Sequence, residues 1–231
     1  MLFLLLLFLL STGTFVFLHS PGFYLSSLEV VGNHRLCEEE VLDLSGLLHG
    51  EHLLVAFDSA VREGILASPW VARASVRLAY PGRIIITIEE RKPAALVTLP
   101  GGGFYLVDQR GFVLEEQAGP GGELVIITGM TQADTASRTQ AASYRLTTAL
   151  RVVRALREVA LPLPVQEIST NQEGEVDLFL AGGARALLGQ VGADLGHVLQ
   201  VLRGVLEGLG DEARSVIYVD LRFEGPVVQK R

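Results

Sequence analysis

The sequence is poor in cysteine and in charged residues, and it has no Lys or Arg before Arg35. Its single cysteine, Cys37, excludes an internal disulfide and fits any compartment. Only 19% of the 231 residues are charged and the net charge is −7, whereas nucleic-acid binders normally present clustered Lys and Arg to the phosphates. With 49% hydrophobic residues, the chain is too apolar to be disordered and long enough to bury one or two cores.

Catalytic and metal-binding motifs are also missing from the sequence. There is no G-x-S-x-G, no Walker motif, and no G-x-G-x-x-G followed by a helix. His49 and His52 flank Glu51, but this segment is a glycine-containing loop without a third ligand at a recognisable spacing. Glu89 and Glu90 are adjacent on a predicted strand, so they point to opposite faces and cannot act as a paired acid and base. We therefore expect a protein without enzymatic activity, metal, cofactor or small-molecule substrate.

The one long hydrophobic run is Leu2–Leu18, which carries no charge and holds 13 Leu, Phe and Val residues. At about 1.5 Å per residue it spans about 25 Å, slightly less than a hydrocarbon core of about 30 Å. We expect residues 1–20 to form a single transmembrane anchor. The alternative is a cleaved signal peptide with its cleavage site at Ser11–Gly13, but apolar residues resume at Phe15 and no basic residue precedes the run.

Residues 23–92 have the pattern of a small α+β domain. A strand over 23–31 ends at the turn Gly32-Asn33, and Cys37 and Glu40 stand where a helix capping box would begin. Asp58 is the expected N-cap of a second helix that runs to about Ala67. Alternating residues over 70–78 put Trp70, Ala72, Ala74, Val76 and Leu78 on one face, and a turn at 80–83 leads to a strand over 84–90. The predicted order is β-α-α-β-β.

Residues 93–231 have the pattern of a β-rich domain with two long helices. Apolar residues recur at helical spacing over 146–156 and 195–209. The expected strands are 104–108, 112–115, 123–128, 165–170, 176–181, 184–188 and 215–222. The complete chain is thus predicted to be α+β, with an N-terminal transmembrane helix, a small domain and a larger β-rich domain.

Several segments together resemble one known family. They are FYLSSLEVVGNHRLCEEEVLDLSGLLHGEHLLVAFD, SPWVARASVRLAYPGRIIITIEERKPAAL, FYLVDQRGFVLEE and SVIYVDLRFEGPVVQKR. The V-x-G-N turn, the P-W-V strand start, the E-R-K-P exit and the V-D-x-x-G hairpin follow one another in the order of the FtsQ/DivIB family. The chain is therefore similar to this family of bacterial division proteins over most of its length.

The resemblance implies a POTRA domain at 23–92 and an FtsQ-type β domain at 93–231. Both would lie outside the cytoplasm in a single-pass type II protein of the plasma (inner) membrane, at the division septum. Such proteins hold together other divisome members, chiefly the FtsB/FtsL pair, and through them influence septal peptidoglycan synthesis. The resemblance implies no catalysis.

The resemblance also implies which residues bind partners. The recruitment surface of the POTRA domain corresponds to the strand with Val76 and Leu78, and a contact acid near the domain junction corresponds to Glu90. We expect a second surface at or near a sheet edge, where an extended segment of an FtsB-like partner would pair with the chain. Its residues are Tyr218, Asp220, Leu221, Arg222, Phe223, Val227 and Val228.

Two other functions are weighed against the division scaffold. A POTRA-containing component of outer-membrane secretion would carry a large barrel, and the sequence lacks a series of alternating strands of about ten residues. A secreted cell-wall enzyme would need a catalytic constellation, and we find none in the sequence.

Overall fold

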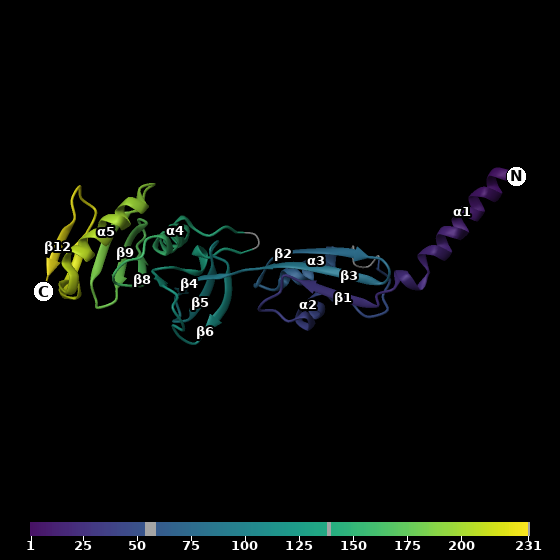
Figure 1. The fold of residues 1–231 in the computed structure, drawn as a ribbon, viewed down its shortest axis with the longest axis horizontal. Helices are drawn as coiled ribbons and strands as arrows, with labels where there is room; N and C mark the ends of the chain where they lie inside the picture. The colour runs from purple at the N-terminus through teal and green to yellow at the C-terminus, as the bar shows by residue number, and fades with distance from the viewer. Residues whose placement is uncertain (54–58, 138–139, 231) are drawn as a thin grey trace. The chain divides into compact units, whose positions relative to one another are not determined.

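The computed structural model describes residues 1–53, 59–137 and 140–230 (Figure 1). Asp58, the expected helix N-cap, lies outside these residues. Contacts divide the chain into two compact units, Met1–Arg91 and Lys92–Arg231, here called unit 1 and unit 2.

The expected transmembrane helix is wrong: within the described ranges, no helix is both long and apolar enough to cross a membrane. The first helix, α1 (Leu2–Leu18), has only 17 residues and none of them is buried. At about 1.5 Å per residue, its length falls short of a hydrocarbon core of about 30 Å.

The two expected long helices of the second domain also need correction. The described residues form five α-helices, and the two in unit 2 have 15 residues each, fewer than α1. The fold remains α+β, with a small first unit and a β-rich second one.

Unit 1 places two helices against a three-stranded sheet, in the predicted β-α-α-β-β order. Its elements after α1 are a short 3₁₀ turn (Pro21–Phe23), β1 (Ser27–Val31), α2 (Glu38–Ser45), α3 (Ser59–Ala67), β2 (Val71–Ala79) and β3 (Arg83–Glu90). In the sheet, β3 lies between β1, which runs parallel to it, and β2, which runs antiparallel. Val41 and Ile65 of the helices pack with Ile86 of β3 in one buried cluster.

The local sequence signals at the start of α2 are confirmed. The Cys37 sulfur accepts a hydrogen bond from the Glu40 N–H at 3.4 Å, and the Glu40 carboxylate accepts one from the Cys37 N–H at 2.8 Å. Gly32, in the turn after β1, has φ = +88°, and a Cβ there would lie 2.2 Å from the Ile88 carbonyl oxygen. Only glycine therefore fits this close approach of the turn to β3.

The predicted single apolar face on β2 is interrupted at its start. The pairing of β2 with β3 shifts register between Val71 and Arg73, so Val71 is buried as well as Trp70 and Ala74. A β-bulge of this kind breaks strict alternation, which a pattern of letters does not reveal.

Unit 2 is built on a nine-stranded sheet with the order β12-β11-β10-β9-β8-β7-β4-β5-β6. Its strands are β4 (Pro93–Thr98), β5 (Phe104–Asp108), β6 (Val113–Gln117), β7 (Ile126–Thr128), β8 (Val165–Thr170), β9 (Glu175–Leu180), β10 (Arg185–Gln190), β11 (Val216–Asp220) and β12 (Val227–Lys230). The remaining elements are α4 (Tyr144–Glu158), α5 (Leu195–Leu209) and two 3₁₀ segments (Gln132–Asp134 and Gly210–Ser215).

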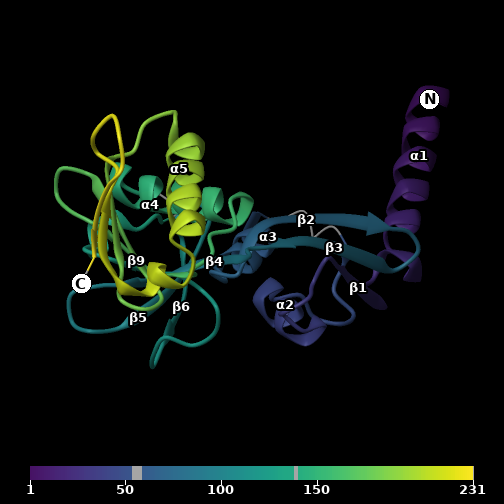
Figure 2. The ribbon, with the colours of Figure 1, turned by 60° about the vertical axis from the view of Figure 1, so that its left-hand side comes forward.

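The two helices of unit 2 form the crossovers of two of its three parallel strand pairs; the third, β4–β7, is connected through β5 and β6. The pairs β7–β8 and β10–β11 are parallel, and the chain between their strands passes through α4 and α5 respectively. Leu146 and Val152 of α4 share one core with Leu199 and Leu202 of α5. Figure 2 shows α5 beside the yellow strands at the β12 end of this sheet. In the strand order, β12 is the outermost strand at this end of the sheet.

Candidate partner-binding site

The predicted docking segment divides between two strands of unit 2. Tyr218 and Asp220 lie on β11, which pairs with β10 on one side and with β12 on the other. Val227 and Val228 lie on β12, and no other described strand pairs with its outer side (Figure 1). The backbone of β11 is therefore occupied on both sides, and the free edge belongs to β12.

Side chains alternate around this edge between core and solvent. Val219 of β11 is fully buried, and Val228 packs against the same core, as does Leu221. Val227 is 48% exposed and Phe223, in the loop between the two strands, is 65% exposed. The edge thus offers free backbone groups together with two exposed apolar side chains.

The side chains of Asp220 and Arg222 form an ion pair with each other. Arg222 donates from Nε to Asp220 Oδ1 at 2.9 Å and from Nη2 to Oδ2 at 2.6 Å, and its N–H also reaches Oδ1 at 3.1 Å. The hydrogen bond from the Arg222 side chain outweighs the effect of burial and lowers the pKa of Asp220. The same bond raises the pKa of Arg222. Gly189, at a bulge in β10, makes room for this pair, because a Cβ there would lie 2.9 Å from Arg222 Cγ.

A cleft of about 500 Å³ opens beside the loop between β11 and β12. Its apolar lining consists of Leu188, Val191, Leu195, Val198, Leu221 and Phe223. An apolar side chain of a bound segment would lose its water here, beside the loop that leads into β12.

The predicted recruitment strand in unit 1 is β2, which is an edge strand of its sheet. Val76 and Leu78 lie two residues apart on one face, and both are half-buried against the core of unit 1. Their side chains therefore contribute to packing as well as to the surface.

Glu90, the predicted contact acid, has partners within unit 1. Its carboxylate accepts hydrogen bonds from the backbone N–H groups of His34, Arg35 and Leu36, at 2.9 to 3.1 Å. Burial alone would raise the pKa of Glu90, but these three donors and the charge of His34 outweigh it, so the pKa lies below its usual value. Sequence reasoning missed this arrangement because the donors are backbone groups of a distant loop.

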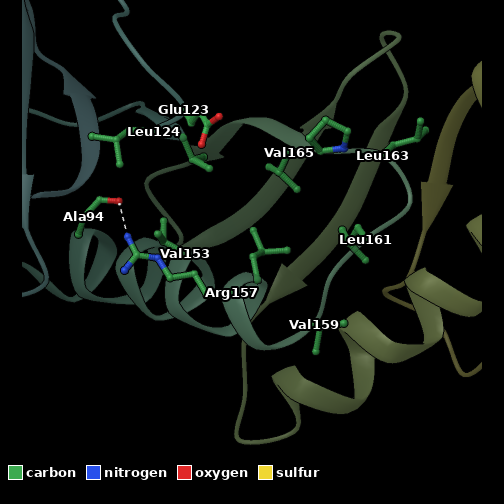
Figure 3. A pocket seen from close by; sticks show the side chains of 12 residues that line it. Ala94, Glu123, Leu124, Val153, Arg157, Val159, Leu161, Leu163 and Val165 are labelled. Carbon is green, nitrogen blue, oxygen red and sulfur yellow. Dashed lines mark hydrogen bonds between the residues drawn. The ribbon is translucent and has the colours of Figure 1, made fainter.

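Sequence reasoning also missed an apolar pocket of about 240 Å³ in unit 2, near the end of α4. Figure 3 shows Arg157 reaching from α4 toward Ala94, whose carbonyl oxygen accepts a hydrogen bond from Nη2 at 3.3 Å. Leu161, Leu163 and Val165 line the opposite part. The pocket can hold an apolar group, and its charged lining residues are Glu123 and Arg157 (Figure 3).

Metal-binding geometry is absent from the described ranges. Among the described residues, no group of three His, Cys, Asp or Glu side chains could hold a metal ion. His49 and His52 therefore belong to no such group.

Comparison with known proteins assigns both units. Residues 23–91 match the model of the FtsQ-type POTRA domain, and residues 95–222 match that of the cell division protein FtsQ/DivIB C-terminal domain. A cell division protein FtsQ from Anaeromyxobacter sp. (strain K) is 34% identical over 196 residues, which cover 83% of this chain and 65% of that protein. Proteins of the same name from Geobacter sp. (strain M21) and Myxococcus fulvus are 26% and 27% identical, over 90% and 89% of this chain and 76% and 72% of theirs.

Proposed function

Since this chain belongs to the FtsQ/DivIB family of cell division proteins, we propose that it is a non-enzymatic scaffold of the divisome. It holds FtsB/FtsL-like proteins and other divisome members together at the septum, outside the cytoplasm, and helps control septal peptidoglycan synthesis through them.

The observation that carries this proposal is the free edge of β12. An edge strand leaves a row of backbone N–H and C=O groups that an extended segment of a partner can pair with. Four to six such hydrogen bonds would contribute roughly 0.5 to 1.5 kcal/mol net each. This is not sufficient alone against the cost of association, so side-chain anchors must supply the rest.

The exposed side chains around the edge are suited to be these anchors. Phe223 projects from the loop beside the cleft, and Val227 lies at the start of the edge strand. Large apolar and aromatic groups that become desolvated carry most of the binding energy in protein interfaces. In the proposed complex, Phe223 and Val227 contact the partner directly.

The other predicted residues would act by shaping this edge. Tyr218 and Asp220 pair with Gln229 and Val227 of β12 and so set its register. Leu221 and Val228 hold the hairpin to the core, and Arg222 fixes the intervening loop through Asp220. In unit 1, we propose that the edge strand β2, with Val76 and Leu78, recruits further divisome members.

The proposal is tested by Phe223→Lys and Val227→Pro in the full chain. Both positions are exposed, and proline is tolerated at the first residue of an edge strand. Both variants should unfold at the temperature of the parent, yet fail to capture an FtsB/FtsL-like partner and fail to support division.

A matched control is Tyr144→Lys, which replaces an equally exposed aromatic residue at the start of α4. This variant should bind the partner normally. Unfolding of the Phe223→Lys and Val227→Pro variants would instead reveal a core role and contradict the docking proposal.

The alternative role in outer-membrane secretion is less well supported. A POTRA domain alone fits either function, but the match of residues 95–222 is to a domain of division proteins.

A further inference from the structure

The apolar pocket near the end of α4 lies at the amino ends of three neighbouring strands. In the sheet, β7 pairs in parallel with β4 on one side and with β8 on the other. Ala94 comes from the start of β4, residues 123–125 lead into β7, and Val165 begins β8. The end of α4 and the connection after it contribute the rest of the lining. The pocket is therefore built by residues of unit 2 alone.

The apolar side chains around this pocket are packed only in part. Leu156, Val159, Leu161, Leu163 and Val165 contact the core of unit 2, remain partly exposed and line the pocket. The pocket has a volume of about 240 Å³. A cavity of about 150 Å³ already holds a benzene ring, whereas sites for drug-sized ligands begin at about 300 Å³. An apolar group of the size of one large side chain therefore fits here, and it would be stabilised by leaving water.

Two opposite charges lie at one end of the pocket. In Figure 3, Glu123 and Arg157 lie on the side of Ala94, whereas Leu161 and Leu163 lie on the far side. Arg157 donates from Nη2 to the Ala94 carbonyl at 3.3 Å, which uses one of the five N–H donors of a guanidinium. Within the described part of the chain, no ion pair joins Arg157 to Glu123. The pocket thus has an apolar end and a polar end with one cation and one anion.

We propose that this pocket binds a free α-amino acid whose side chain is apolar and about the size of leucine. The Arg157 guanidinium binds the carboxylate of the ligand, and the Glu123 carboxylate accepts hydrogen bonds from its ammonium group. Hydrogen bonds of this kind, between two charged groups, are short and strong. The side chain of the ligand enters the apolar end. This inference does not depend on the proposed scaffold function.

The lining is suited to holding such a ligand rather than converting it. Among the described residues that line the pocket there is no Ser, Thr, Cys, His or Lys that could act as a nucleophile. A bound amino acid would instead link the end of α4 to the segment before β7. Because it binds the folded chain, it should stabilise this end of unit 2.

Calorimetric titration of the full chain with four small molecules tests which groups are recognised. Leucine carries the carboxylate, the ammonium group and the apolar side chain. Glycine lacks the side chain, leucinamide lacks the carboxylate, and N-acetylleucine lacks the positive charge. Leucine should bind, and each of the other three should bind at least about tenfold more weakly.

Two variants assign the charges to the two ends of the ligand head. Arg157→Gln should lower the affinity for leucine to that for leucinamide and leave the affinity for leucinamide unchanged. Glu123→Gln should do the same with respect to N-acetylleucine. The matched controls Arg154→Gln and Glu173→Gln remove the same charges at exposed positions that do not line the pocket, and they should bind leucine like the wild type. If Arg157→Gln also binds leucine like the wild type, Arg157 only holds Ala94 and the proposal is wrong.

Hydrogen exchange locates the bound leucine, even where the heat of binding is small. At saturating leucine, the amides of Val125, Leu161 and Leu163 should exchange at least roughly tenfold more slowly, whereas those of β12 should not change. Protection at the cleft beside the β11–β12 loop instead would overturn the proposal. So would equal binding of N-acetylleucine and leucine, or neither heat nor protection with millimolar leucine.

Discussion

The two edges of the nine-stranded sheet, β12 and β6, differ in how they are protected. The β6 edge carries Glu115 and Glu116, has a register shift in its pairing with β5, and Phe112 just before it pairs with Ala136. The β12 edge has no carboxylate and exposes Val227, although its pairing with β11 also has a register shift and Lys230 at its end pairs with Glu212. Charges, bulges and covering segments are the usual means of preventing edge-to-edge pairing. The β6 edge, with two carboxylates and the Phe112–Ala136 bridge, is therefore the better protected of the two, and we call it the closed edge and β12 the open edge.

The largest effect is expected from giving β12 the protection of β6. Val227→Glu combined with Gln229→Glu places two carboxylates on the face opposite to Val228. Binding of an FtsB-like segment should weaken at least tenfold, about 1.4 kcal/mol, because an incoming strand would have to desolvate these charges. Calorimetric titration of the full chain measures the change.

The control for this pair is Gln172→Glu with Gln200→Glu, which adds the same charge at exposed positions away from the edge. It should bind the segment like the wild type. Equal weakening in the control would mean that net charge, rather than the edge, governs binding.

A smaller effect is expected from Asp220→Asn, which removes the ion pair behind the open edge. We expect a loss of about 1 kcal/mol of stability at pH 7, because the Arg222 side chain is partly exposed. The lowered pKa of Asp220 fixes the sign of the pH dependence. The stabilisation is present above about pH 3.9, the ordinary carboxyl pKa, and is lost as the pH falls through the lowered value.

Urea unfolding of the wild type and Asp220→Asn at several pH values checks this expectation. The difference in their free energies of unfolding should shrink in acid. A difference that stays constant with pH would show that the hydrogen-bonding shape of Asp220, rather than its charge, stabilises the loop.

The smallest effect is expected at the closed edge. The charge of Glu116 raises the pKa of Tyr105 on the neighbouring strand, so Glu116→Gln should move that pKa back toward its usual value. Ultraviolet absorbance of tyrosinate at alkaline pH measures the shift. Partner binding should not change, and a loss of binding would identify β6 as a docking edge after all.

Local signals in the sequence predicted local structure well. The Gly32-Asn33 turn and the capping box of Cys37 and Glu40 form as expected, because each depends on residues within a few positions of one another. The alternating and helical patterns likewise placed most strands and both crossover helices.

Features that depend on distant backbone groups were not predictable. The sequence suggested that the chain ends in one strand over 215–222, whereas β12 is too short at four residues to show a pattern. From its residue type alone, Glu90 would be expected at the surface without fixed partners. The three backbone N–H groups that donate to its carboxylate lie 54 to 56 residues away in the chain. The 17-residue length of α1 was already visible in the sequence. The expectation of a membrane span relied on its apolar composition more than on this short length.

The position of β12 in the chain also has a consequence for synthesis. It follows every other described strand, and among the described strands it pairs only with β11, so it cannot join the sheet before β11 does. A nascent or truncated chain that stops before Val216 would present the edge of β10 instead, without Phe223 or Val227. In the proposed function, the binding edge then exists only on chains whose translation has passed Lys230, so incomplete copies would not compete for the partner.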